Sequence, residues 1–185
     1  ENKLKSIGDS NVSAMICDST NIFSPGRAGS ESEVRDSLLR IMEIKPNRIL
    51  VTSFASNVAR MESIFYCAKK TGRNICLVGR SMQRIYKVAR KCGYLQGIIE
   101  PLEPRDAKKV AKNKILYLAT GSQGEPMGAM NRIINGIHPD VHLEKDDCII
   151  FSSKIIPGNE KKLYHLQNLI VKNKIEMISE ENAFV

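Results

Sequence analysis

Five short stretches rich in hydroxyl, amide and glycine residues hold the side chains of this sequence that could do chemistry. Each stretch directly follows an apolar run, and they span residues 18–21, 53–57, 79–82, 120–126 and 152–160. Hydroxyls and backbone N–H groups gathered in this way bind oxyanions, and phosphate is their usual ligand. A single serine or asparagine in such a place often only caps the helix that follows. Because all five stretches share the pattern, we expect them to form one anion-binding site.

Other kinds of catalytic site find little support in the sequence. The dinucleotide motif G-x-G-x-x-G does not follow the first apolar run, and neither a P-loop nor a G-x-S-x-G nucleophile motif occurs. His138 and His142 have helical spacing, but Pro139 between them argues against a metal-binding pair on a helix. The five cysteines are odd in number and lack zinc-binding spacing, so most are expected to be core residues in a reducing compartment. We therefore expect no metal site in this chain.

The apolar runs that precede these stretches predict the strands that position them. They are short, nearly continuous in Ile, Val, Leu and Met, and bounded by turn residues, as is typical of strands buried on both faces of a parallel sheet. They span residues 13–17, 48–54, 74–78, 114–119, 148–152 and, more weakly, 175–178. In a sheet of this type ligands bind beyond the carboxyl ends of the strands, which lie at one edge. The strands therefore predict that the five polar stretches share that edge.

Apolar residues at helical spacing predict five helices between these strands. The stripes run through residues 34–42, 58–68, 82–92, 127–134 and 163–170. Ser30 and Glu33 form a capping-box pattern at the start of the first helix. A further short helix is expected near residues 105–111, in a stretch where prolines interrupt the rhythm. The alternation predicts an α/β fold, a doubly wound and mostly parallel Rossmann-like sheet flanked by helices.

The charge of the chain is unevenly distributed. The 185 residues carry a formal charge of +8, and residues 60–114 hold 14 basic and 4 acidic side chains, so that this stretch is strongly positive. A local basic surface suits a polyanion such as nucleic acid, although two solvated helix faces would give the same count. No apolar run is long enough to span a membrane, and no basic and then apolar leader opens the chain. We therefore expect a cytoplasmic protein that does not contact a membrane.

Six blocks of residues resemble the β-CASP domain of bacterial ribonuclease J, in the order and spacing of that family. They lie at residues 17–21, at 25–26 with 30–31, at 52–57 with 60, at 79–82, at 119–126, and at 151–153 with 156–160. The resemblance implies that residues 1–185 form a β-CASP domain, which in this family is inserted into a metallo-β-lactamase-fold nuclease domain. RNA enters the cleft between the two domains. The implied function is that of one cleft wall in an RNA-processing 5′→3′ exo- and endoribonuclease.

The zinc-binding motifs of the family are missing from this chain. The H-x-H-x-D-H motif is absent, and the chain stops about where the H-x-S-G-H segment would begin. The resemblance thus implies that two zinc ions are held by the metallo-β-lactamase domain, outside this sequence. We expect the chain alone to bind no cofactor and to be inactive. The partners implied are RNA, the metallo-β-lactamase domain and, for the parent enzyme, further copies of itself.

The resemblance also assigns roles to particular positions. Asp18 matches the acidic residue of the family's first motif, which lies beside the zinc centre and orients a catalytic histidine. Ser56 and Asn57 match a loop that binds an RNA phosphate. The remaining candidates are residues expected to face the cleft, namely Ser53, Arg60, Arg80, Ser122, Gln123, Gly124 and Glu125.

Two other functions would use the same polar strand ends. One is a nucleotide- or small-ligand-binding Rossmann-like module, against which the missing glycine fingerprint and the missing ribose-binding acid count. The other is a structural insert that only shapes the cleft of its parent enzyme. Saturable nucleotide binding without RNA binding would favour the first of these.

Overall fold

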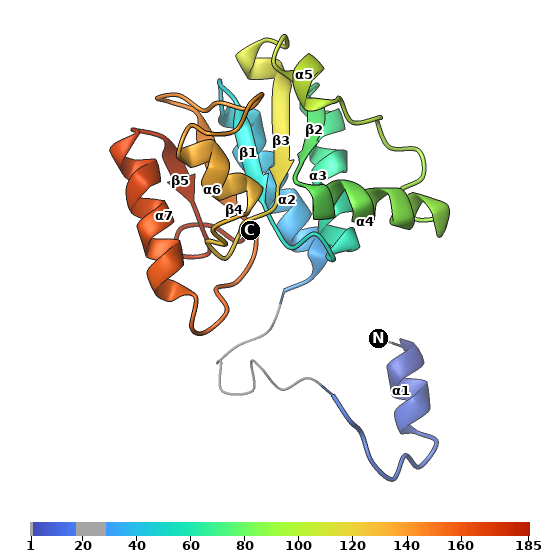
Figure 1. Ribbon diagram of the computed structural model, residues 1–185. Helices are drawn as coiled ribbons and strands as arrows, with labels where there is room; N and C mark the ends of the chain where they lie inside the picture. Colours follow the sequence, from blue (N-terminus) through green and yellow to red (C-terminus); the bar gives the residue numbers. More distant parts are fainter. Residues whose placement is uncertain (1, 18–28) are drawn as a thin grey trace.

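A parallel sheet forms the centre of the fold (Figure 1). A computed structural model describes residues 2–17 and 29–185 of the chain. Within them the sheet has five strands in the order β2-β3-β1-β4-β5, all parallel. The strands are β1 (Ile49–Thr52), β2 (Asn74–Val78), β3 (Ile115–Ala119), β4 (Cys148–Phe151) and β5 (Glu176–Ile178). Every residue of the three central strands is buried, which confirms the prediction of strands covered on both faces.

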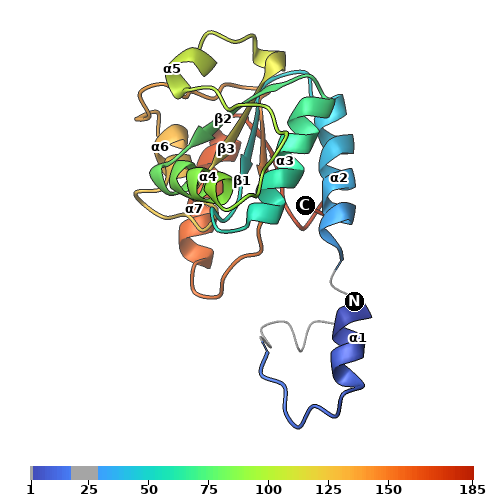
Figure 2. The same cartoon turned by 90° about the vertical axis from the view of Figure 1, so that its right-hand side faces the viewer.

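Helices cover both faces of the sheet (Figure 2). Helices α2 (Glu31–Ile44), α3 (Val58–Lys70) and α4 (Arg80–Lys91) contribute to one core with Val51 and Leu118. Helices α5 (Pro104–Ala107), α6 (Ala129–Ile134) and α7 (Glu160–Lys172) contribute to a second core on the opposite face with Leu50 and Tyr117. The two remaining helices are α1 (Asn2–Gly8) and the 3-10 turn η1 (Lys112–Lys114). The predicted doubly wound α/β fold is thereby confirmed.

The starts of three helices show how the sequence directs local structure. The hydroxyl of Ser30 accepts a hydrogen bond from the N–H of Glu33 at 3.2 Å, and the Glu33 carboxylate accepts one from the N–H of Ser30 at 2.5 Å, which confirms the predicted capping box. The side chain of Asn57 caps α3 by accepting from the N–H of Arg60 at 3.0 Å. By contrast, α4 begins after Gly79, which has a φ of 113° and supplies no side-chain cap.

Two predictions about secondary structure were wrong, and a third element is present with different bounds. Residues 13–17 form no strand, and Met15 and Ile16 are 80% and 101% exposed. An apolar run becomes a buried strand only where a sheet edge and covering helices receive it, and the described residues offer this run neither. Met127 lies outside α6 and is exposed, so the stripe of that helix begins at Met130. The short helix expected near 105–111 begins earlier and ends at Ala107, as α5.

None of the helices in the described part of the chain combines the length and the apolar character that a membrane crossing would require.

Candidate functional site

Four of the five predicted polar stretches meet at the carboxyl edge of the sheet. Backbone hydrogen bonds join them there from strand to strand. The N–H of Ser53 donates to the carbonyl of Ala119 at 3.3 Å, and the N–H of Ser152 donates to the carbonyl of Thr52 at 2.9 Å. The N–H of Thr120 likewise donates to the carbonyl of Val78 at 3.2 Å. The fifth stretch, with Asp18, lies outside the described residues.

A hollow of about 600 Å³ lies beyond the ends of β1 and β4, and its charged side chains are Arg60, Lys154 and Glu180. The Arg60 side chain is only 11% exposed, and its Nε donates to the carboxylate of Glu31 at 2.8 Å. Its Nη1 donates to the carbonyl and to the hydroxyl of Ser152, at 3.1 and 2.6 Å. The charge of Arg60 is therefore paired inside the protein, and much of its hydrogen-bonding capacity is already used there. It holds the loop after β4 against α3.

The two residues expected to bind an RNA phosphate lie at the rim of this hollow. Ser56 is exposed at the turn before α3, and the half-buried Asn57 lines the hollow while capping that helix. The hydroxyl of Ser153 is also buried at the hollow and has no hydrogen-bond partner among the described residues. A buried hydroxyl without a partner is uncommon, and an incoming phosphate oxygen would satisfy it. A phosphate in this hollow could therefore be bound by groups at the start of α3 and by the Ser153 hydroxyl after β4.

Gln123, one of the residues expected to face the cleft, is buried and joins two loops. It is 4% exposed, and its Nε2 donates to the carbonyl of Lys154 at 2.9 Å while its Oε1 accepts from the N–H of Ile156 at 2.8 Å. The side chain thus joins the loop after β3 to the loop after β4. Gly124 lies directly against the backbone of Lys162 in α7, where a Cβ atom would come within 2.8 Å. Ser122 is buried beside them, whereas Glu125 is exposed.

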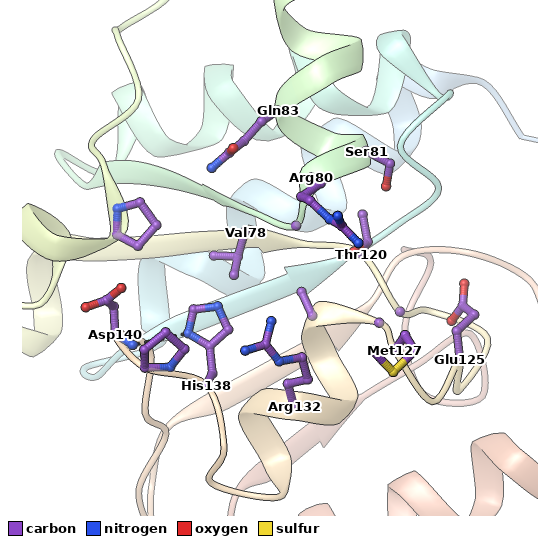
Figure 3. Close-up of a pocket in the computed structure, with 16 residues that line it drawn as sticks. Val78, Arg80, Ser81, Gln83, Thr120, Glu125, Met127, Arg132, His138 and Asp140 are labelled. Atoms are coloured by element: carbon purple, nitrogen blue, oxygen red, sulfur yellow. Dashed lines mark hydrogen bonds between the residues drawn. The ribbon is translucent and has the colours of Figure 1, made fainter.

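A second hollow, of about 680 Å³, lies beyond the ends of β2 and β3 (Figure 3). Arg80 lines it from the first residue of α4, and Arg132 lines it from α6. Among the described residues, neither guanidinium has an ion pair or a side-chain hydrogen bond. Thr120 lies at its floor, and His138 and Asp140 line its other end. The hollow thus holds two unpaired arginines and a threonine hydroxyl that can bind an anion, together with two carboxylates, Asp140 and Glu125, the second of which accepts a hydrogen bond from the N–H of Gln123 at 3.0 Å.

His138 belongs to this second hollow and has a defined tautomer. Its Nδ1 accepts hydrogen bonds from the N–H groups of Asp140 and Val141, at 3.3 and 3.1 Å. The proton of the neutral imidazole is therefore on Nε2. Burial lowers the pKa of His138, and the nearby Arg132 lowers it further. The side chain is accordingly a neutral hydrogen-bond donor at neutral pH.

Comparison with known proteins gives the family. A sequence profile described as "Ribonuclease J, beta-CASP domain" matches residues 46–170. The chain belongs to this β-CASP family. Ribonuclease J of Sinorhizobium meliloti is 36% identical over 185 residues, which is 100% of this chain and 33% of the relative. Ribonuclease J of Synechocystis is 39% identical over 186 residues, which is 99% of this chain and 28% of the relative.

A protein named ribonuclease J2 is among the relatives as well. Ribonuclease J2 of Bacillus subtilis is 31% identical over 184 residues, which is 99% of this chain and 32% of the relative. The chain thus spans a third or less of the length of these relatives. The resemblance that the six blocks of residues carry is confirmed.

Helix α4 of the β-CASP domain presents a face of basic residues. This helix has no acidic residue, and four of its side chains are exposed without an ion pair to another described residue, namely Arg80, Arg84, Lys87 and Lys91. Arg90 on the same helix pairs instead with Glu100 at 2.8 Å. Because α4 begins at the second hollow, its positive face extends directly from the carboxyl edge of the sheet.

Metal-binding residues do not gather in the described part of the β-CASP domain. Across residues 2–17 and 29–185, no three His, Cys, Asp or Glu side chains lie close enough to hold a metal ion. His138 has Nδ1 committed to backbone N–H groups, which leaves only its Nε2 for any ligand. The described residues therefore do not fit the two zinc ions that the resemblance implies.

Sequence reasoning did not select Arg132 or Asp140, which complete the second hollow. Arg132 lies inside a helix, and no signal in the sequence says which way that helical face points. Asp140 lies in a turn after α6, where an aspartate usually serves the turn itself. His138 was considered only as a metal ligand. Two of the polar stretches in the sequence point to this hollow, residues 79–82 after β2 and residues 120–126 after β3.

Proposed function

We propose that this β-CASP domain forms one wall of an RNA cleft within a longer ribonuclease and binds RNA phosphates there. The observation that carries the proposal is the uncompensated positive face of α4 beside the carboxyl edge of the sheet. Lys and Arg side chains that release counterions from phosphates supply most of the affinity for a nucleic-acid backbone. Membership of the β-CASP family is consistent with RNA as the polyanion.

The loop at Ser56 and Asn57 is the proposed contact for one RNA phosphate. It precedes the 13-residue helix α3, whose N-terminal N–H groups favour an anion. The unpartnered hydroxyl of Ser153 faces the same hollow. Ser53, Ser122, Gln123 and Gly124 shape this wall from behind, whereas the exposed Glu125 lines the second hollow.

The hydrolytic step is assigned to the part of the enzyme outside this chain. We propose a metallo-β-lactamase domain as the partner that holds two zinc ions, since the described residues of the β-CASP domain do not fit them. Asp18 would orient a histidine of that partner in the full enzyme. The β-CASP domain alone would then bind neither zinc nor a catalytic water. The parent is proposed to be a cytoplasmic homo-oligomer with exo- and endonuclease activity.

The first experiment measures binding of a single-stranded RNA to the purified chain at several salt concentrations. The affinity should fall as salt rises, with a slope of about −0.7 for each phosphate contacted. The double variant Arg84→Gln/Lys87→Gln should weaken binding and reduce the slope by about 1.4. The matched control Lys161→Gln/Lys172→Gln removes the same charge from exposed positions on α7 and should change little. Salt-independent binding, or equal losses in the two double variants, would refute the proposal.

The assignment of catalysis is tested on the same sample and on the full enzyme. Metal analysis and an RNA cleavage assay of the purified chain should find neither zinc nor cleavage. Stoichiometric zinc with cleavage would contradict the assignment and would return His138 and His142 to consideration. In the full enzyme, Asp18→Ala should abolish cleavage while the circular dichroism spectrum stays unchanged. Unaltered cleavage would refute the role of Asp18.

A further inference from the structure

The hollow beyond β2 and β3 is shaped by two turns that require glycine. Gly79 and Gly121 have φ values of 113° and 108°, which L side chains rarely adopt. A Cβ at Gly79 would come within 2.4 Å of the Thr120 hydroxyl, and one at Gly121 within 2.8 Å of the Met130 Cβ. Gly79 allows the turn after β2 to approach Thr120 after β3, and Gly121 allows the turn after β3 to approach α6. These close approaches form the floor of the hollow.

One end of this hollow has the chemistry of a phosphate site. Arg80 and Arg132 line it from opposite walls, and neither is paired with another described residue (Figure 3). Helix α4 has twelve residues and no side-chain cap, so its first N–H groups and its dipole add to the positive potential. The hydroxyls of Ser81 and Thr120 offer further donors. An arginine that faces a phosphate binds it through two parallel hydrogen bonds.

The other end suits a sugar. Asp140 supplies a carboxylate, and a carboxylate in this kind of fold accepts hydrogen bonds from ribose hydroxyls. His138 offers its Nε2–H, because its Nδ1 already accepts two backbone hydrogen bonds. Pro104 and Pro139 add flat apolar surface. The volume of about 680 Å³ lies within the range of pockets that bind small ligands.

We propose that this hollow binds one ribonucleotide unit, with its phosphate between Arg80 and Arg132 and its ribose hydroxyls at Asp140. The unit is either a free mononucleotide or one nucleotide of an RNA strand, and the second case rests on the proposed RNA function. The site is distinct from the Ser56–Asn57 loop. In the strand order β2-β3-β1 it lies beyond the two strands that precede β1, one to two strand spacings or about 5–10 Å along the sheet from that loop.

The test compares adenosine monophosphate, its 2′-deoxy form, inorganic phosphate and a short single-stranded RNA as ligands of the purified chain. Affinities are measured by calorimetry, and binding is located by amide chemical-shift changes. Arg132→Gln should weaken binding of the ligand that uses the site by about tenfold, as expected for one lost charge-assisted contact. Asp140→Asn should reduce the preference for the ribose over the deoxyribose form. Arg80→Gln provides a second variant at an exposed position, and Arg40→Gln on α2 is the matched control.

The results distinguish a free mononucleotide from one nucleotide of an RNA strand. They also distinguish failure of the nucleotide site from failure of the proposed RNA function. A loss of mononucleotide affinity in Arg132→Gln, with unchanged RNA affinity, supports a free-nucleotide site. A loss of RNA affinity supports a site for one nucleotide of the strand. If neither Arg132→Gln nor Arg80→Gln weakens any ligand more than Arg40→Gln does, the nucleotide site is refuted. RNA binding that still responds to the Arg84→Gln/Lys87→Gln variant would then leave the RNA function standing.

Discussion

Arg60 and Ser152 join the first turn of α3 to the carboxyl end of β4. One guanidinium nitrogen, Nη1, donates to both the carbonyl oxygen and the hydroxyl of Ser152, at 3.1 and 2.6 Å. The Nε of the same side chain donates to Glu31 at 2.8 Å, so three segments that are distant in sequence meet at one arginine. The contact fixes the relative position of the two loops that border the first hollow.

Arg60→Ala is expected to lower the free energy of unfolding by about 2–4 kcal/mol, because it leaves Glu31 and the Ser152 carbonyl without their partner in a largely buried place. Arg60→Lys should recover part of this loss, since a lysine keeps the charge but not the planar set of donors. Urea denaturation measures both variants. The control Arg40→Ala, at an exposed position on α2, should stay within about 0.5 kcal/mol of the wild type. Equal effects of Arg60→Ala and Arg40→Ala would contradict the structural role.

The strands of the sheet could be predicted from the sequence because strands buried on both faces are apolar throughout. Residues 75–78 and 115–119 show this, and turn residues mark their ends. The run at 13–17 has the same composition and is nevertheless exposed, since composition does not reveal what covers an apolar run. Positions at the carboxyl edge followed from strand direction alone. The sequence did not show which side chains at that edge face outward. Gln123 is an example, because its polar side chain makes buried hydrogen bonds to the loop after β4.

Gln123→Leu is expected to destabilise the protein by about 1–3 kcal/mol. The substitution leaves the N–H of Ile156 and the carbonyl of Lys154 without their partner in a buried place. Gln123→Glu keeps the acceptor for Ile156, but it loses the donor to Lys154 and buries a carboxylate, so it should be no better tolerated. Thermal unfolding measures both. Gln96→Leu, at an exposed position, is the control, and a cost for it equal to that of Gln123→Leu would count against the bridging role.

Two substitutions, Gly121→Ala and Gly136→Ala, distinguish the energetic cost of steric overlap from the cost of an unfavourable backbone conformation. Both glycines have positive φ, 108° and 71°, so alanine is strained at either position. A Cβ at Gly136 meets no atom within 4 Å, and we expect this substitution to cost about 1 kcal/mol. A Cβ at Gly121 would lie 2.8 Å from the Met130 Cβ and 3.1 Å from the Met130 nitrogen. Overpacking then adds to the strain, for a total of about 2–4 kcal/mol by urea denaturation. Equal costs would show that the turn after β3 can move away from α6 freely.

Three buried cysteines predict that the protein loses stability in alkali. Burial raises the pKa of Cys67, Cys76 and Cys148 to about 12. In the unfolded chain these thiols ionise near their ordinary pKa, about 8.5. Below that pH both states hold the proton and the stabilisation is fully present. Between about pH 8.5 and pH 12 only the folded state keeps the thiol protons. The free energy of unfolding should therefore fall by up to about 1.4 kcal/mol per pH unit for each thiol.

The measurement is the urea midpoint between pH 7 and pH 10.5 for the wild type and two single-cysteine variants. Cys76→Ala removes one buried thiol, so its stability should fall less steeply with pH than that of the wild type, whatever its stability at pH 7. Cys92→Ala removes an exposed thiol and should leave the slope unchanged. Burial of Tyr117 also raises its pKa to about 12 and adds to the decline only above pH 10, so the interval from pH 8.5 to 10 reports chiefly on the thiols. A flat midpoint over that interval would mean that the buried thiols ionise as readily in the folded protein as in the unfolded chain.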